Sequence, residues 1–466
     1  MGTFSEFKSS FYSRVTDFNV FNCQEFNLLK VVLDGLKVDY FGKMKYRPLV
    51  FKAGWYASGF NFIYRIKHRA LLEAAKAKFD AIEIAHQAEN LIIDSGRVAQ
   101  NKSLRTVSIY FENIREELGA GSCYTLFQNR CSLNYGAVLP EIFIVNKYNN
   151  YSNEEKKVRS DLKKTFDKIR SGVNFTPTEL KNIEIAFDKF FNDYRFWSYF
   201  LKLHGFKKSF FMPHYHNEGF ILALKRNNIK AIEIQHGLIA TEDIFYVFPK
   251  TIAPIAQRAL FSDKIFTYGQ YWVNKLLLGG EFLPAQIDII GDYQITSIHI
   301  TEEKQKLIMD FKGSKPCILV TTQTFLEAEF ILYIAWLSND LLKRGQDNKI
   351  IVKLHPAEKK ADYLPLDALS NVLIVDANVD YLLSMCSYHI SVYSTTLYTA
   401  LKYGCKNYSL NSLQCQDYTS QLVKDGISVL LQFDQNPLSI PANDNAFEVS
   451  YYYDGFEKHK HKLQEC

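Results

Sequence analysis

The sequence lacks any apolar run of about 18 residues, so we expect no helix of this chain to cross a membrane. Its first residues, MGTFSEFKSSFYSRV, are polar and do not resemble a secretory signal. The eight cysteines form no CxxC pair and have no regular spacing, which indicates reduced thiols rather than a disulfide framework or a zinc site. We therefore expect a cytoplasmic protein.

The motifs that mark several large enzyme classes are missing as well. There is no GxxxxGK[ST] phosphate loop, no GxSxG nucleophile turn and no GxGxxG dinucleotide fingerprint. No two aspartates are separated by a single residue, so the D-x-D with which many transferases bind a metal–nucleotide complex is absent. We accordingly expect no metal site and no cofactor.

Charge of one sign is not in large excess. The chain has 55 Lys and Arg against 50 Asp and Glu, and this net charge of +5 does not favour a nucleic-acid partner. Within residues 41–78, however, nine Lys and Arg accompany a single acid, Glu73, and aromatic residues are interleaved. This composition predicts peripheral contact with anionic lipid headgroups at the inner face of the cytoplasmic membrane. An anionic substrate, or a solvated rim around core aromatics, would produce the same pattern.

Apolar residues make up 47% of the 466 residues, which is enough for two or three domains with large cores. Continuous apolar runs alternate with helical patterns, as expected of buried parallel strands in a doubly wound sheet. In the C-terminal half we expect strands at 317–323, 349–356, 371–377, 389–396 and 406–410, with helices at 326–343, 379–388 and 396–404.

The middle of the chain repeats this pattern, whereas the first 150 residues are less regular. We expect strands at 79–86, 209–215, 231–235, 264–269 and 287–291, a strand beginning near 106, and helices at 154–169, 178–204, 217–228 and 270–280. The predicted fold class is α/β, with two Rossmann-like domains facing a cleft. We place the first domain at 1–290, the second at 291–445 and a tail at 446–466.

Ligands of open α/β sheets bind at the carboxyl ends of the strands, so the residues at these ends are the candidates. Between a strand and a helix, the Ser/Thr cluster at 394–396 offers hydroxyls and free N–H groups that suit a phosphate. The alternative is that these hydroxyls only cap the N-terminus of the helix. The histidine of KLHP can donate to a phosphate oxygen on a loop stiffened by proline. The predicted anion-binding residues are Thr322, Lys353, His355, Pro356, Ser391, Ser394, Thr395 and Thr396.

A second histidine, His236 in EIQHG, ends a strand of the first unit. We expect Gly237 to let the backbone turn sharply and expose the imidazole, which could then deprotonate an acceptor or stabilise charge. Glu242 and Asp243 are rival bases, and a core histidine is the alternative for His236. On the acceptor side we also expect Gln235, His86, His214 and His216. His214 and His216 alternate on one strand face, and we expect them to line the substrate or to serve structure rather than to bind a metal.

The QHG turn, the HP turn and the Ser/Thr cluster before a helix together resemble the GT-B glycosyltransferases of bacterial surface polysaccharides. The pattern is similar to bacterial sialyl- and Kdo-transferases and to CDP-glycerol-type polyol-phosphate transferases. In those families the HP histidine and the Ser/Thr motif hold the phosphate of a cytidine-activated donor, which maps onto His355 and 394–396. A His-Gly base of the polyol-phosphate transferases maps onto His236. Sialyltransferase-like enzymes instead have an acidic D/E-D/E-G motif where this chain has Gln235-His236-Gly237.

The resemblance implies a metal-independent glycosyltransferase. The sugar would pass from a nucleotide-activated donor, with cytidine favoured, to a capsule, O-antigen or related surface glycan, free or lipid-linked. The donor would lie in the second domain and the acceptor would enter from the first. The alternatives are a polyol-phosphate transferase, a nucleotide-sugar 2-epimerase and a non-catalytic partner in glycan assembly.

Overall fold

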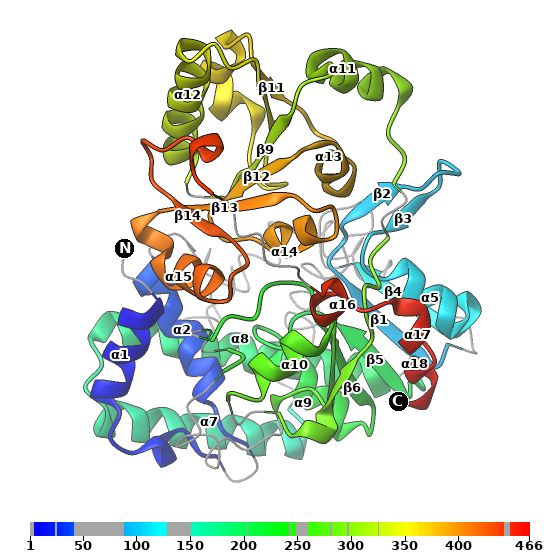
Figure 1. The fold of residues 1–466 in the computed structure, drawn as a ribbon. Coiled ribbons are helices and arrows are strands. Elements are labelled where there is room, and N and C mark those ends of the chain that lie inside the picture. Colours follow the sequence, from blue (N-terminus) through cyan, green and yellow to red (C-terminus); the bar gives the residue numbers. More distant parts are fainter. Residues whose placement is uncertain are drawn as a thin grey trace, which may run out of the picture.

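Two six-stranded parallel sheets form the framework of the chain in a computed structural model (Figure 1). The structure describes residues 4–23, 26–41, 88–127, 151–202, 204–241, 243, 245–247, 260–279, 282–295, 298–324, 326–441 and 448–466. The predicted strand at 79–86, the candidate His86, Glu242 and nearly all of the basic segment 41–78 lie outside these residues.

The first sheet has the strand order β4-β1-β5-β6-β7-β8, and all neighbouring strands are parallel. Its strands are β1 (Asn90–Asp94), β4 (Cys123–Phe127), β5 (Lys208–Phe211), β6 (Lys230–Ile234), β7 (Lys264–Thr267) and β8 (Ile287–Ile289). The helices of this half are α1 (Phe4–Arg14), α2 (Leu29–Phe41), α5 (Glu112–Leu118), α7 (Asn153–Gly172), α8 (Pro177–Lys202), α9 (Glu218–Arg226) and α10 (Gln270–Leu276).

The second sheet has the order β11-β10-β9-β12-β13-β14, again with all neighbours parallel. Its strands are β9 (Cys317–Thr321), β10 (Lys349–Lys353), β11 (Val372–Ile374), β12 (Tyr388–Ser391), β13 (Lys406–Leu410) and β14 (Val429–Leu431). The helices are α11 (Glu302–Lys312), α12 (Glu327–Lys343), α13 (Val379–Met385), α14 (Thr395–Leu401) and α15 (Gln416–Lys424).

The strands of both sheets form where the sequence has short, continuous apolar runs. All five residues of β9 and of β1 are buried, which is what a parallel strand covered on both faces requires. The predicted α/β class with two Rossmann-like units, each built on a six-stranded parallel sheet, is confirmed. Three strands of the two six-stranded sheets, β1, β4 and β14, were not expected from the sequence.

A small antiparallel hairpin, β2 (Val98–Gln100) with β3 (Thr106–Ser108), follows β1. It bonds to the segment that joins the two sheets: His299 N–H donates to the Gln100 carbonyl at 2.7 Å, and Ile295 N–H donates to the Ile109 carbonyl at 3.1 Å. The sequence predicted a strand beginning near 106, and the structure continues it into α5 rather than into a sheet.

The end of the chain returns to the first sheet as three short helices, α16 (Val449–Tyr452), α17 (Phe456–His459) and α18 (Lys462–Glu465) (Figure 1). Asp454 N–H donates to the Tyr268 carbonyl at 2.9 Å, and its own carbonyl accepts from Asp292 N–H at 2.8 Å. A glycine at 291 is needed here, because its φ is +84° and a Cβ would lie 2.7 Å from the Asp454 carbonyl. The proposed boundaries at 290/291 and 445/446 stay predictions.

The two halves share part of one core. Leu397 and Tyr398 of α14 and Leu422 of α15 belong to the same cluster of buried residues as the strands of the first sheet. Polar groups add to this contact, because Lys275 of α10 lies 2.9 Å from Asp425. Helices α14 and α15 of the second half are therefore packed against the first half.

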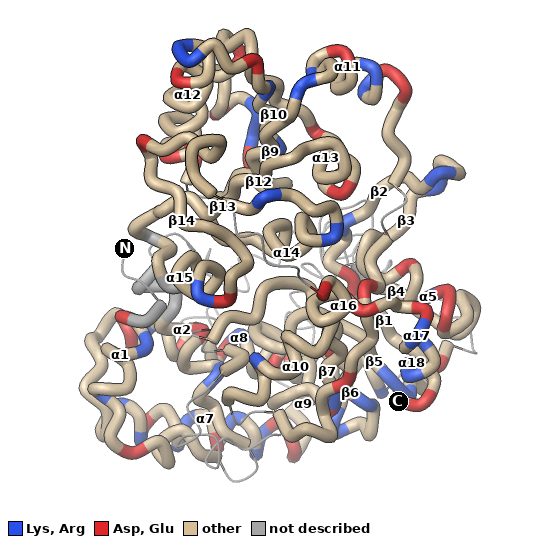
Figure 2. The backbone as a smooth tube through the Cα atoms, in the orientation of Figure 1, with Lys and Arg blue, Asp and Glu red and all other residues tan. Residues whose placement is uncertain are grey.

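Charged residues of both signs are distributed over the whole described chain (Figure 2). Near the C-terminus, where basic segments gather, Asp288 forms ion pairs with Lys264 and Lys462, and the Leu463 and Gln464 carbonyls accept from Lys208. The charges of Lys264 and Lys462 are thus paired with an aspartate of the chain, and the Lys208 ammonium is hydrogen-bonded to backbone carbonyls. The seven cysteines of the described residues are all free thiols, and no described helix is long and apolar enough to span a membrane.

Substituting Gly219 by alanine tests the close packing of α9 against α8. A Cβ there would lie 2.4 Å from the Phe190 carbonyl oxygen and 2.8 Å from the Tyr194 amide nitrogen, so the helices would have to separate. We expect Gly219→Ala to lower the free energy of unfolding by about 1–3 kcal/mol, measured in urea. Gly205→Ala is the control, since its methyl would meet no atom within 4 Å. Equal losses in both variants would contradict this packing.

Candidate functional site

The loop after β1 carries an arginine that the sequence analysis missed. Gly96 makes the turn with a φ of +75°, and its N–H donates to Asp94 Oδ1 at 2.9 Å. Arg97 follows with an exposed guanidinium, whose Nη1 donates to the Tyr110 hydroxyl at 2.9 Å. Arg97 has no ion-pair partner in the described parts of the chain. The apolar run NLIID followed by Ser-Gly is a strand-and-turn signal that could have pointed to it.

The positive charge of Arg97 acts on both His236 and His355. Burial lowers the pKa of His236 to about 4; Glu233 opposes this, and the positive charges of Arg97 and His214 add to it. Burial also lowers the pKa of His355, and Arg97 and Lys353 add to that shift while Glu358 opposes it. One arginine thus acts on a histidine at the end of β6 and on another at the end of β10.

His236 is placed by the residue before it. Gln235 is buried, and its side chain donates to the Gly237 carbonyl at 2.9 Å and accepts from Tyr268 N–H at 3.1 Å. The Gln235 carbonyl accepts from the Tyr293 hydroxyl at 2.6 Å. Nδ1 of His236 is buried and has no hydrogen-bond partner among the described residues. An acceptor-side role for Gln235 stays a prediction, because its polar atoms already fix the turn.

Gly237 was expected to let the backbone turn sharply and expose the imidazole, and this role stays a prediction. Gly237 does not have a left-handed backbone conformation, and a Cβ at this position would meet no atom within 4 Å. The chain turns here because Gln235 ties it back to the neighbouring strand. The glycine leaves open space beside the imidazole, which is compatible with a ligand but not required by the fold.

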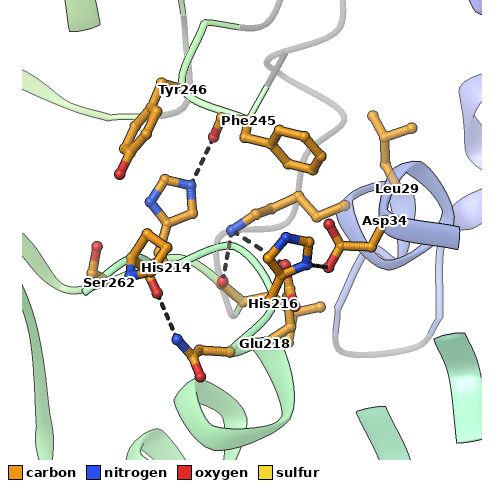
Figure 3. Close-up of polar contacts among 12 residues, drawn as sticks. Leu29, Asp34, His214, His216, Glu218, Phe245, Tyr246 and Ser262 are labelled. Carbon is orange, nitrogen blue, oxygen red and sulfur yellow. Dashed lines mark hydrogen bonds and ion pairs between the residues drawn. The ribbon is translucent and has the colours of Figure 1, made fainter. Parts of the chain in front are cut away.

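His214 and His216 do not share a strand face, contrary to the expectation. β5 ends at Phe211, and both histidines lie in the following loop, because Pro213 has no N–H with which to extend the ladder. They turn to different partners (Figure 3): His214 is fully buried with Nε2 2.7 Å from the Phe245 carbonyl, and His216 Nδ1 lies 2.7 Å from Asp34 Oδ2. His216 also lines a small cavity with Asp34 and Glu218.

Of the two rival bases, only Asp243 lies within the described residues. Its Oδ1 accepts from Phe245 N–H at 2.9 Å, and its N–H donates to the Ala240 carbonyl at 3.0 Å. Tyr418 of α15 lies in the other half. Burial is the main cause of its raised pKa, and the negative charge of Asp243 raises it further. Asp243 therefore closes a turn beside α15, and its predicted role as a base stays a prediction.

The HP turn is held rigidly by a glutamate that the sequence analysis did not select. Glu358 Oε2 accepts from His355 N–H at 2.8 Å and from the Thr322 hydroxyl, and Oε1 accepts from the Tyr363 hydroxyl at 2.8 Å. Thr322 is buried in this arrangement, whereas Pro356 is exposed. Lys353 lies 3.2 Å from Asp376, whose side chain is 96% exposed. The loop thus presents His355 in a defined position.

The hydroxyl cluster is largely bonded within the protein. Ser391 is buried and donates to the Thr321 carbonyl at 3.0 Å, and Thr396 lies 3.1 Å from the Thr321 hydroxyl. Ser394 is the N-cap of α14, where it accepts from Thr396 N–H at 3.2 Å. Capping, which the sequence analysis kept as an alternative, is therefore present. A phosphate-binding role for Thr395 and its neighbours stays a prediction.

No group of three or more His, Cys, Asp or Glu side chains is placed to hold a metal ion within the described ranges. The described candidates instead combine an uncompensated arginine with two histidines of lowered pKa. At neutral pH both imidazoles are uncharged, and the cations that act on them are Arg97 and, at His355, also Lys353. Such an arrangement can bind an anion and offer a neutral imidazole beside it.

Removing the Glu358 carboxylate tests how the HP turn is held. We expect Glu358→Ala to lower the free energy of unfolding by about 1–3 kcal/mol, because it leaves the Thr322 and Tyr363 hydroxyls without their acceptor and removes one of the two acceptors of His355 N–H. Asp376→Ala, which removes an exposed ion-pair partner of Lys353, should change it by about 0–1 kcal/mol. Urea unfolding of both variants measures this, and a loss no larger for Glu358 than for Asp376 would refute the assignment.

No protein-family model matches the chain, and no curated protein matches it. Among solved structures, the UDP-GlcNAc 2-epimerase of Methanocaldococcus jannaschii is similar over 81% of this chain and 98% of its own, with 11% identity and a TM-score of 0.47. That of Neisseria meningitidis, bound to UDP-GlcNAc, covers the same shares with 15% identity and a TM-score of 0.48. The trehalose-6-phosphate synthase of Burkholderia multivorans matches 82% of this chain and 92% of its own, with 9% identity and a TM-score of 0.40. Likenesses this distant identify no activity for the chain, and the transferase subgroups named from its motifs stay predictions.

Proposed function

We propose that the protein is a nucleotide-sugar-dependent glycosyltransferase that adds a sugar to a surface glycan such as a capsule or O-antigen. The single observation that carries this proposal is that the charge of Arg97 acts on both His236, which follows β6 of the first sheet, and His355, which follows β10 of the second. A nucleotide diphosphate or monophosphate supplies the anion that Arg97 lacks in the described residues. Arginine recognises phosphate oxygens with two parallel hydrogen bonds.

The donor's phosphate would lie between Arg97 and the HP turn. There His355, fixed by Glu358, donates to a phosphate oxygen, and Lys353 adds a second cation. The hydroxyls of Ser394 and Thr395, at the start of α14, extend the polar surface on the same edge. A cytidine-activated donor is the choice that the motif resemblance favours.

His236 would act on the acceptor hydroxyl from the opposite side. In the ligand-free protein, burial and Arg97 hold the pKa of His236 at about 4, too low for an efficient base near neutral pH. A bound phosphate neutralises Arg97 and adds negative charge, and both changes raise the pKa of His236. Donor binding would thereby prepare the base, which limits proton transfer to the occupied site.

A thermal-shift panel of CMP, CDP, UDP, GDP and dTDP tests the proposal. A ligand that binds only the folded protein stabilises it by about 2.7 kcal/mol at a concentration a hundredfold above Kd. We expect one nucleotide to raise Tm, and Arg97→Gln and His355→Gln to weaken its binding about ten- to a hundredfold, as expected when a charged hydrogen bond is lost. Lys306→Gln on the exposed face of α11 is the control and should bind like the parent.

His236→Gln separates binding from turnover. We expect this variant to keep the Tm shift but to lose transfer of sugar from the corresponding nucleotide sugar to glycan. No shift with any nucleotide, or equal binding by Arg97→Gln and the parent, would overturn the proposal. Conversion of the nucleotide sugar to an epimer without acceptor would instead identify a 2-epimerase.

A further inference from the structure

His389 is a fully buried histidine of the second sheet, and both of its ring nitrogens have partners. It belongs to β12, which lies between β9 and β13. Nδ1 lies 3.0 Å from Asn407 Oδ1 of β13, and Nε2 lies 3.0 Å from the hydroxyl of Thr321, the last residue of β9. The imidazole therefore links three neighbouring strands.

The amide beside His389 determines which ring nitrogen carries a proton. Asn407 Nδ2 donates to the Leu397 carbonyl at 2.7 Å, so Oδ1 is the atom that faces Nδ1. An amide oxygen only accepts, and Nδ1 is therefore protonated. Burial lowers the pKa of His389 to about 4, although the hydrogen bond to Asn407 opposes this shift. At neutral pH the ring thus has a single proton, and Nε2 is an acceptor.

The directions of the next two hydrogen bonds follow from this. Thr321 must donate its hydroxyl hydrogen to His389 Nε2, because Nε2 has no hydrogen to give. The Thr321 oxygen also lies 3.1 Å from the Thr396 hydroxyl, and with its hydrogen already used it can only accept there. Thr396 is therefore the donor of that bond, and its hydroxyl hydrogen points into the protein.

This direction distinguishes Thr396 from the two hydroxyls before it. Ser394 accepts from Thr396 N–H at 3.2 Å, and neither Ser394 nor Thr395 donates its hydroxyl hydrogen to another described residue. A phosphate oxygen needs donors, which these two hydroxyls can supply. Thr396 has only the lone pairs of its oxygen left, and these suit a ligand group that itself donates a hydrogen bond.

Thr396 contacts the same edge of the second sheet that carries the HP turn. Thr321 pairs with Lys353 of β10, and N–H of the following residue, Thr322, donates to the Lys353 carbonyl at 3.1 Å. The strand that Thr396 contacts is thus the neighbour of the strand that leads into the turn. Thr396 itself is half-buried, so its side chain is not enclosed by the protein.

We propose that His389 is a positioning residue of the candidate site: acting through Thr321, it turns the Thr396 hydroxyl hydrogen inward, so that Thr396 accepts from a hydroxyl of the ligand and does not bind phosphate. This inference rests on the proposed function for the ligand, a nucleotide sugar, whose ribose and sugar both have hydroxyls. His389 does not touch the ligand, because it is fully buried. Thr396, which the sequence placed among the anion-binding residues, thereby receives a different role.

Histidine-selective ¹⁵N NMR of the full chain tests the hydrogen-bond directions without any ligand. The His389 signals are assigned through backbone correlations in the parent protein. At neutral pH we expect a neutral ring with its proton on Nδ1, and a coupling across the hydrogen bond between Nε2 and the Thr321 hydroxyl proton. Thr321→Val should remove this coupling and leave the proton on Nδ1. A proton on Nε2 of the parent protein would overturn the proposal, and that result does not depend on the folding of a variant.

Binding of three probes tests the role of Thr396: inorganic phosphate, the nucleotide that raises Tm, and the corresponding nucleotide sugar. Thr396→Val keeps the shape but removes the acceptor. We expect it to weaken binding of the nucleotide sugar about two- to tenfold, as for one neutral hydrogen bond, and to leave binding of inorganic phosphate unchanged. Thr396→Ser retains the hydroxyl and should bind like the parent.

The three probes also identify the hydroxyl that Thr396 accepts from. An equal loss for the nucleotide and the nucleotide sugar assigns it to the ribose, whereas a loss for the nucleotide sugar alone assigns it to the sugar. Weaker binding of inorganic phosphate by Thr396→Val, or no loss with any probe, would overturn the role of Thr396. If no probe binds the parent, the proposed function fails together with the ligand named here, while the NMR experiment still decides the hydrogen-bond directions.

Discussion

Parallel strand pairing is the constraint on which the rest of the structure depends. Because all strands of a parallel sheet run in one direction, their carboxyl ends lie at one edge, and the loops that leave this edge are neighbours. Arg97, His236 and His355 lie on three loops far apart in the sequence, and they come together because each loop leaves such an edge.

Carboxylates of the same chain hold the loops near both histidines. Glu233, which is fully buried, accepts from His214 N–H and from the Tyr246 and Ser262 hydroxyls, whereas the His236 turn itself is held by Gln235. Glu358, which is half-buried, accepts from His355 N–H and from the Tyr363 hydroxyl. Arg97 differs, because its guanidinium is exposed and bonds only to the Tyr110 hydroxyl among the described residues. The site thus combines two rigid imidazoles with one cation that a ligand can still engage.

The elements that were predicted well are those with a strong local pattern. The strand 406–410 and the helix near 326–343 agree with β13 and α12 within a residue, because continuous apolar runs and helical periodicity specify them locally. The expected strand at 209–215 is shorter, since Pro213 cannot continue the ladder, and its two histidines therefore separate. β1 was missed because three apolar residues between Asn90 and Asp94 give little periodicity, and Arg97 was missed with it.

The sequence by itself determined the α/β class, the presence of two units and the placement of His236 and His355 at strand ends, because each depends on residues that are close along the chain. Only the tertiary structure decided which strand ends meet, that Ser391 and Gln235 are occupied by internal hydrogen bonds, and that Glu233 and Arg97 act on the same imidazole. These relations join residues separated by up to some hundreds of positions. They depend on strand order and on the packing of one domain against the other, which no local pattern encodes.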